Sequence, residues 1–263
     1  MSITEFRVRL KAALKACAIH LSLSVLIATA VWLLVVRRWY PYPLDELAGG
    51  LVLLALVFGV DVVCGPLLTL VAYNPAKKRR LMLLDFTVIG SIQLAALAYG
   101  LYSVTEARPV VLAFEVDRFV AVPAAGVDLT RLKSAPANLQ ALSWRGPVLI
   151  GTRKPKDAAE QMNAMTVLLQ QGLEISARPD WWQSYELSRP DVKTRMKHLA
   201  NLYAARRLDE QTLIETARLK SGLPMSSLYY LPMTGQKRED FIAILDAEAN
   251  IVGYANVSGF DIK

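Results

Sequence analysis

The pattern of apolar and polar positions changes at about residue 104. Before this point, three long runs of apolar side chains are separated by short polar stretches, whereas residues 105–263 alternate between short apolar and polar segments. The runs cover residues 16–36, 48–73 and 81–104. A helix needs about 20 apolar residues to cross the hydrocarbon core of a bilayer. The pattern therefore predicts three transmembrane helices, preceded by a short N-terminal segment of residues 1–15.

The first apolar run has an alternative interpretation as a cleaved secretory signal. It lies near the N-terminus, and "ATA" at residues 28–30 offers a small-x-small cleavage site. However, the apolar run continues through Trp32 to Val36, which is not typical of a cleavage region. We therefore favour an uncleaved membrane anchor.

The basic residues that flank the runs indicate an orientation. Four precede the first run, two follow it and four separate the second run from the third (Arg7, Arg9, Lys11 and Lys15; Arg37 and Arg38; Lys77, Lys78, Arg79 and Arg80). Because cytoplasmic loops carry an excess of Lys and Arg, this distribution predicts a cytoplasmic N-terminus and a cytoplasmic 74–80 loop. Residues 105–263 then lie outside, which is the periplasm in a bacterium with two membranes. Trp39, Tyr40 and Tyr42 are expected in an aromatic belt at the outer interface.

The second half of the chain reads as strands, then helices, then strands. Residues 108–122 are rich in Val and Phe, and they predict one long strand or a hairpin. Helices are predicted at 155–172, at 189–207 with Pro190 at its start, and at 209–222. A strand at 227–233 and a hairpin at 240–260 with its turn at 246–250 follow. This order predicts a compact α+β domain at 105–263.

Composition agrees with a membrane protein. The chain of 263 residues is 54% hydrophobic with a mean hydropathy of +0.31, more apolar than an ordinary soluble domain. Of its net charge of +7, ten Lys and Arg against five Asp and Glu place +5 in residues 1–104. Basic residues are expected beside membrane helices, so this excess does not indicate nucleic acid, and we expect no nucleic-acid partner. The two cysteines, Cys17 and Cys64, both lie in apolar runs, so no disulfide or zinc cluster is expected in 105–263.

Catalytic motifs are missing from the sequence. It contains no glycine-rich phosphate loop, Gly-x-Ser-x-Gly, His-Glu-x-x-His or Cys-x-x-Cys. Glu115 and Asp117 are predicted to share one strand face, as a pair for acid–base chemistry or, with Arg118 adjacent, as ion pairs at an edge strand. His198 is expected on a helix surface. We therefore predict no catalytic residues, no cofactor and no metal.

Two adjacent tryptophans at 181–182 have two interpretations: a platform for carbohydrate or peptide, or a pair that packs beneath a loop, which is the commoner outcome.

Asp61 lies deep inside the second apolar run. It is thirteen residues from Asn74, or about 20 Å of helix, and Gln93 is twelve residues from Leu81, or about 18 Å. Thr29 lies at a similar depth in the first run, so the three polar side chains are expected to meet at one level. No Lys or Arg lies at that depth. The group either stabilises the helix bundle, at about 1–2 kcal/mol per hydrogen bond, or receives a charge from a partner helix.

Small residues and a proline surround this aspartate. Gly59, Gly65 and Pro66 are predicted to bend the second helix and to allow another helix to approach closely.

Several blocks of the sequence resemble a known family. "RRWYPYPL", "VDVVCGPLLTL", "RPVVLAFEVDRFVAV" and the closing "LYYLPM…FIAILDAEANIVGYANVSGF" are similar to the TfpX/TfpZ type of type IV pilin accessory protein. The resemblance extends over almost the whole chain. It implies a bacterial inner-membrane protein that assists a cognate pilin, with pilin or the pilus assembly platform as partner and no established catalytic mechanism. It also implies a partner for Asp61, because type IV pilins begin with an apolar helix that carries a positive amino terminus.

Two other functions are weighed against this one. A membrane-anchored enzyme that modifies pilin or envelope glycans is disfavoured by the missing acid–base constellation. A periplasmic ligand sensor is disfavoured because only about 15 N-terminal residues and one short loop are expected in the cytoplasm.

Overall fold

The computed structural model describes residues 3–260, and the chain divides into two compact units. The first unit contains the chain up to Arg37 together with Gly50–Glu106, and the second contains Arg38–Gly49 together with the chain from Ala107 onward.

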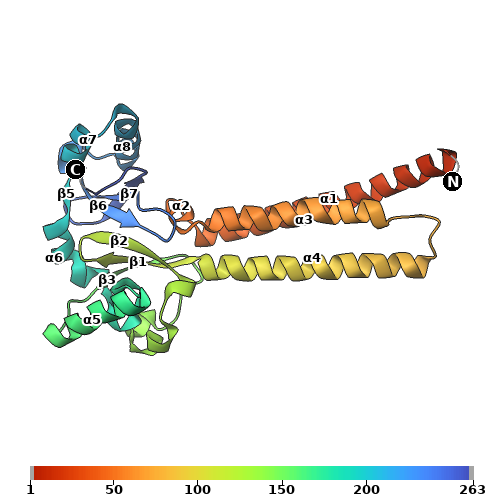
Figure 1. Ribbon diagram of the computed structural model, residues 1–263. Helices are drawn as coiled ribbons and strands as arrows, with labels where there is room; N and C mark the ends of the chain where they lie inside the picture. Colours follow the sequence, from red (N-terminus) through yellow and green to blue (C-terminus); the bar gives the residue numbers. More distant parts are fainter. Residues whose placement is uncertain (1–2, 261–263) are drawn as a thin grey trace. The chain divides into compact units, whose positions relative to one another are not determined.

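The first unit consists of three long apolar helices, as predicted. They are α1 (Ile3–Trp39), α3 (Gly50–Ala72) and α4 (Arg79–Ala107), and each is long and apolar enough to cross a membrane. Trp32 packs on Phe58 with ring centroids 6.4 Å apart, and Tyr73 packs on Phe86 at 6.1 Å. These contacts pair the end of one helix with the beginning of the next, so sequential helices run antiparallel to each other (Figure 1).

The helices α1 and α4 extend beyond the predicted spans of 16–36 and 81–104 because polar residues at their ends continue the same helical turns. Which residues of these helices lie within the membrane stays a prediction.

The second unit is built on a mixed sheet with the order β4-β3-β1-β2-β6-β7-β8, and β5 pairs with β6 beside this path. The pairs β1–β3 and β2–β6 are parallel and the other pairs are antiparallel. This confirms the predicted α+β class. The strands are β1 (Pro109–Glu115), β2 (Arg118–Pro123), β3 (Val148–Thr152), β4 (Trp182–Ser184), β5 (Lys197–His198), β6 (Tyr229–Thr234), β7 (Phe241–Leu245) and β8 (Ile251–Ala255).

The described part of this unit also contains five α-helices and six short 3-10 helices. The α-helices are α2 (Leu44–Ala48), α5 (Ala158–Gln171), α6 (Tyr185–Arg195), α7 (Leu199–Ala205) and α8 (Leu208–Ser221). The 3-10 helices are η1 (Ala124–Gly126), η2 (Leu129–Ser134), η3 (Ala137–Leu139), η4 (Ile175–Ala177), η5 (Pro179–Trp181) and η6 (Met225–Ser227).

The segment 108–122 forms a hairpin, and its turn corrects the predicted carboxylate pair. Val116 has a φ of 59°, and Asp117 N–H donates to Glu115 O at 2.7 Å, which closes a tight turn between β1 and β2. Asp117 therefore lies in the turn and does not share a strand face with Glu115. The two strands are central in the sheet rather than at its edge.

The predicted helix at 189–207 is wrong in one respect: it is two helices. α6 ends at Arg195, and the next residues form β5, which pairs Lys197 with Tyr230 and His198 with Tyr229. Sheet pairing thus interrupts the helical pattern before α7 begins. Pro190 lies inside α6 rather than at its start, and the ring of His198 stacks on that of Tyr229 at 4.7 Å.

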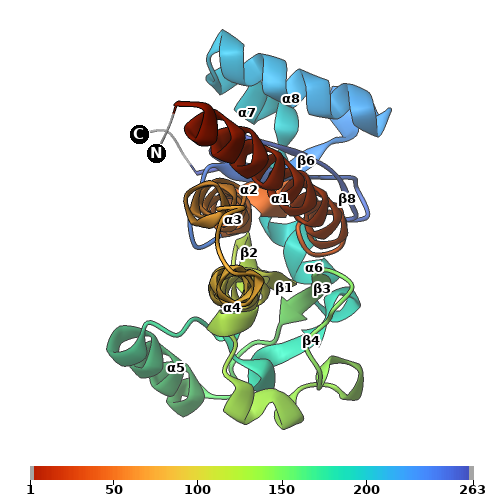
Figure 2. The same ribbon diagram turned by 90° about the vertical axis from the view of Figure 1, so that its right-hand side faces the viewer.

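The two faces of the sheet are covered differently. One face carries a single apolar cluster, which includes Phe114, Phe119 and Phe241 and packs against α2 and α6. The opposite face carries two clusters, one around Val120 and Ile150 and one around Ile242 and Ile244, the second beneath α7 and α8. Figure 2 shows α7 and α8 at one end of the sheet and α5 at the other. The cover on this second face is therefore divided.

Residues 38–49 belong to the second unit, where the sequence placed only a short connection between two spans. Leu44 and Leu47 are 4% and 0% exposed and belong to the same cluster as Phe119 and Phe241. Tyr40 is also buried, so it does not form the aromatic belt predicted for it. Burial against the sheet explains this correction, because apolar side chains between two spans can enter the core of an adjacent domain.

Candidate functional site

A polar contact joins α3 and α4 at Asp61, the aspartate inside the second apolar run. Gln93 Nε2 donates to Asp61 Oδ1 at 3.1 Å, with a longer contact of 3.4 Å to Asp61 O. Both side chains are half-buried. Equal depth in two antiparallel helices thus places these residues opposite each other, as their distances from the helix ends suggest.

Gly65 makes room for this contact. A Cβ added at Gly65 would lie 1.9 Å from Gln93 Nε2, far inside van der Waals contact, so only glycine leaves the amide where it is. Pro66 follows within α3, and the helix continues through it to Ala72. Gly59 differs, because a Cβ there would meet nothing within 4 Å apart from its chain neighbours and the backbone of its own helix.

Thr29 does not join Asp61 and Gln93. Its side chain is exposed, and Thr29 Oγ1 donates to Val25 O of its own helix at 2.8 Å. The face of α1 that packs in the bundle contains Ser24 and Val35, which are 4% and 7% exposed. Thr29 has the expected depth but lies outside this face.

A second polar contact in the bundle was not predicted. His20 Nδ1 and Thr69 Oγ1 form a hydrogen bond of 2.6 Å between α1 and α3, and Thr69 is 2% exposed. Asp61, Gly65 and Thr69 recur at intervals of four residues, so they lie along one face of α3. This spacing is the signal that would have found Thr69.

Arg238 connects the 38–49 segment to the sheet. Its guanidinium donates to Glu46 Oε2 at 2.6 Å, to Asp240 Oδ2 at 2.6 Å and to Asn256 Oδ1 at 2.9 Å. The hydrogen bond from Arg238 holds the pKa of Asp240 below its usual range. Lys237 N–H also donates to Leu47 O at 3.2 Å. These bonds fix α2 to the strands β7 and β8 and to the turn that precedes them.

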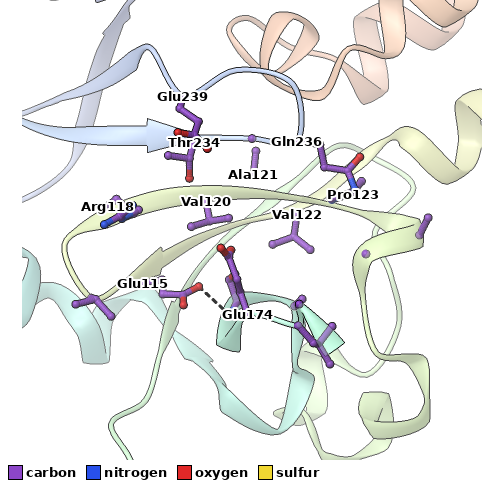
Figure 3. Close-up of a pocket in the computed structure, with 18 residues that line it drawn as sticks. Glu115, Arg118, Val120, Ala121, Val122, Pro123, Glu174, Thr234, Gln236 and Glu239 are labelled. Carbon is purple, nitrogen blue, oxygen red and sulfur yellow. Dashed lines mark hydrogen bonds between the residues drawn. The ribbon is translucent and has the colours of Figure 1, made fainter. Parts of the chain in front are cut away.

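A cleft of about 680 Å³ opens beside β2, on the sheet face whose cover is divided. It is lined by β2, the hairpin turn, residues 172–177 and the turn at 234–239 (Figure 3). Glu115 Oε2 accepts a hydrogen bond of 3.0 Å from Ser176 N–H. Burial raises the pKa of Glu115 and the nearby Glu174 raises it further, while Ser176 and Arg118 act in the opposite direction. We call this feature the acidic cleft.

The two adjacent tryptophans and the possible metal ligands do not form further sites in the described residues. Trp181 and Trp182 are 1% and 4% exposed, and Trp182 Nε1 donates to Ser176 O at 2.7 Å, so they are a buried pair and not a platform. In the part of the chain that the structure describes, no three His, Cys, Asp or Glu side chains are grouped to hold a metal ion.

Comparison with known proteins gives a consistent result. The family model described as fimbrial assembly protein FimB matches residues 8–49, which include most of α1 and all of α2. Two proteins of Dichelobacter nodosus, the fimbrial assembly proteins of serogroups I and E1, are each 31% identical over 250 residues, which cover 95% of this chain and 97% of theirs. The fimbrial assembly protein of serogroups C1 and C2 from the same organism is 42% identical over 105 residues, 40% of this chain and 80% of its own. No solved structure matches the chain.

The similarity to the first two relatives extends over nearly the full length of both sequences, and it therefore includes the three apolar helices as well as the α+β unit. It agrees with the resemblance to type IV pilin accessory proteins found in the sequence. The chain belongs to the family of fimbrial assembly proteins.

Proposed function

We propose that this protein is an inner-membrane accessory factor that assists type IV pilus assembly by binding pilin or the assembly platform. The observation that carries the proposal is Asp61, an acidic side chain in an apolar helix whose carboxylate receives a hydrogen bond from Gln93. We propose that the protein acts by binding rather than by catalysis, since its relatives are named for assembly.

The proposed topology has the N-terminus in the cytoplasm and the α+β unit in the periplasm. It is supported by the basic residues beside the N-terminus and in the 74–80 loop. It is also supported by the membership of residues 38–49 and 107–260 in one unit, since both segments must then lie on the same side of the membrane.

Within the bundle, we propose that Asp61 receives a positive charge from a partner helix. Gln93 supplies one neutral hydrogen bond to Oδ1, and no cation contacts the carboxylate in the described residues. A charged group inside lipid costs free energy unless it is paired, so a cation that arrives beside this carboxylate would be stabilised by it. Pairing therefore favours a partner with a charged helix end, such as the amino terminus of a pilin helix.

The test is co-purification of pilin with the detergent-solubilised protein, normalised to the accessory protein in the membrane. Asp61→Asn keeps a donor and an acceptor in place but removes the charge, so we expect normal protein levels with reduced pilin capture and reduced surface piliation. Asp61→Leu should also lower bundle stability, because Gln93 loses its acceptor. Thr29→Val serves as a control, since Thr29 bonds only within its own helix.

One result separates charge binding from a purely structural role. If Asp61→Asn captures as much pilin as the wild type while Asp61→Leu fails, Asp61 only stabilises the bundle. The charge-site proposal is then abandoned.

A further inference from the structure

We propose that the acidic cleft binds a cationic side chain, a lysine or an arginine, presented by a partner polypeptide. This goes beyond the proposed function because it gives the α+β unit a ligand class of its own, separate from Asp61.

The cleft results from how β2 and β6 pair. These parallel strands are in register at only two positions, Phe119 with Met233 and Val120 with Thr234. Beyond Val120, the residues of β2 from Ala121 to Pro123 pair with β1 alone. The two apolar clusters on this face stop on either side of the same place. The sheet thus forms one wall of the opening, and residues 172–177 and the turn at 234–239 form the others.

The charge of the cleft is negative and unbalanced. Glu115, Glu174 and Glu239 all line it, and none of them has an ion pair among the described residues. Figure 3 shows Glu115 and Glu174 on the same side of β2, with Glu239 on the turn that follows Thr234.

Arg118 is the one cationic side chain among the lining residues, but it already forms an ion pair outside the cleft. Arg118 Nε donates to Asp117 Oδ1 at 2.9 Å, and the guanidinium lies over the ring of Phe260 at 4.9 Å. Arg118 also attracts Glu115, but one guanidinium that is paired with Asp117 cannot balance both Glu115 and Glu174. A positive ligand would therefore be attracted to these two carboxylates.

Ser176 supplies a second, independent observation. It lines the cleft and is buried, with an exposure of 0%, and its Oγ makes no hydrogen bond of normal geometry in the described residues. The hydroxyl still lies near enough to Glu115 to lower the pKa of that carboxyl. A buried polar atom without a partner costs free energy. A ligand N–H group bound to Glu115 would approach this hydroxyl, and a small movement of the Ser176 side chain would let its Oγ accept a hydrogen bond as well.

The geometry favours an organic cation over a metal ion. The carboxylates are not grouped as metal ligands among the described residues. The walls include Val120, Val122 and Leu173, which suit the methylene stem of a long basic side chain. The volume of about 680 Å³ is within the range of about 300–1,000 Å³ that is common for ligand sites, and it has room for a side chain with the flanking peptide.

The experiment uses the full-length protein in detergent micelles with labelled valine methyl groups. Val120 and Val122 line the cleft and report binding by their NMR shifts. The probes are the capped tripeptides acetyl-Gly-Arg-Gly-amide and acetyl-Gly-Lys-Gly-amide, and acetyl-Gly-Gln-Gly-amide is the neutral control. We expect saturable shifts of both valines with the two cationic peptides and none with the neutral one.

The variants test the residues directly. Glu115→Gln keeps an acceptor for Ser176 N–H, and Glu174→Gln changes an exposed side chain, so both should fold. Each should weaken binding of the arginine peptide, and for Glu115→Gln we expect about tenfold or more, as for loss of a charge-assisted hydrogen bond. Glu248→Gln is the matched control, since Glu248 is exposed and lies outside the cleft.

Three outcomes would overturn the proposal. The first is the absence of saturable valine shifts with either cationic peptide. The second is equal binding by the wild type and both cleft variants, or equal binding of the glutamine peptide. The third is displacement of the arginine peptide by magnesium or calcium ions at the concentrations at which they shift the same valines, which would assign the cleft to a metal.

Discussion

Arg238 Nη1 donates to Glu46 Oε2 at 2.6 Å and joins residues that are 192 positions apart in the chain. Glu46 lies in the short connection between two apolar helices, and Arg238 lies in the turn before β7. The contact shows that the connection between α1 and α3 is an integral part of the α+β unit. The periplasmic domain that we propose is therefore discontinuous in sequence.

The first prediction concerns the stability of this unit. Residues 105–263 expressed alone would lack Leu44 and Leu47, whose burial contributes about 1.5–3 kcal/mol each. We expect this fragment to unfold at a lower temperature, with weaker cooperativity, than a fragment in which residues 38–49 are joined to residue 107 by a flexible Gly/Ser linker of about 20 residues. Circular dichroism during heating measures the difference.

A matched control keeps the linker and removes only the apolar contacts. The double change Leu44→Ser and Leu47→Ser in the linked fragment should return its melting temperature to that of residues 105–263 alone. Equal melting of all three fragments would mean that the 38–49 segment adds nothing to the core.

The sequence predicted those helices whose pattern lies within one continuous segment of the chain. Long apolar runs predicted α1, α3 and α4, and the pattern at 155–172 predicted a helix close to the observed α5. The burial of Leu47 depends on the sheet formed by residues more than sixty positions later, so no local pattern indicates it. The break between α6 and α7 has the same origin, since β5 forms only by pairing with β6.

The candidate site was predictable in depth but not in rotation. Counting at 1.5 Å per residue placed Asp61, Gln93 and Thr29 at one level. Each residue also turns the helix by about 100°, so equal depth does not decide which face a side chain occupies. Gln93 faces Asp61, whereas Thr29 faces away. The acidic cleft was missed because its walls come from segments far apart in the sequence.

The second prediction tests the topology. Alkaline phosphatase needs an oxidising compartment for its disulfides and is active only outside the cytoplasm. Fusion at the C-terminal end of the chain should therefore give activity, and fusion at Lys78 should give none. Fusion at Asp45, in the 38–49 segment, should agree with the C-terminal fusion even if the insertion disturbs the domain. The opposite pattern would invert the orientation.

The third prediction concerns pH and α5. No residue of α5 is buried, so polar contacts at its start hold it in place. Glu160 accepts two hydrogen bonds from Arg153, at 2.6 and 2.9 Å, and one from Lys156 N–H at 2.6 Å. The bonds from Arg153, followed by the one from Lys156 N–H, lower the pKa of Glu160 from 4.5 to about 2.

A depressed carboxyl pKa stabilises the folded state above the unfolded value and loses this effect as the pH falls through the folded value. We therefore expect amide exchange of residues 158–171 to accelerate, relative to the intrinsic rate, as the pH is lowered from about 4.5 to about 2. Glu160→Gln should show faster exchange at neutral pH and little further change in that window. The buried amides of β7 serve as the internal reference, and equal acid sensitivity in the variant would exclude Glu160 as the cause.

The last prediction compares two glycines in α3. In Gly65→Ala, the new methyl group would lie where Gln93 Nε2 now lies, only 1.9 Å away. Gln93 has a flexible side chain, so it can move aside, but it then loses its hydrogen bond to Asp61. Relative to Gly59→Ala, the expected cost is about 0.5–2 kcal/mol, the value of one such bond in a membrane. In Gly59→Ala, the methyl group meets nothing within 4 Å apart from its chain neighbours and the backbone of its own helix. Alanine also favours helix by about 1 kcal/mol over glycine, so this variant should be unchanged or more stable.

Thermal unfolding of the two variants in detergent, followed by loss of helical circular dichroism, measures the difference. The same change can be made in a Gln93→Leu background, where the bond that the methyl group breaks is already absent. There, Gly65→Ala should lower the stability much less than it does in the wild type. If Gly65→Ala is as stable as Gly59→Ala, the contact between Gln93 and Asp61 contributes no stability. Gln93 would then not compete with a partner for Asp61. Pilin capture by Gly65→Ala should therefore equal that of the wild type.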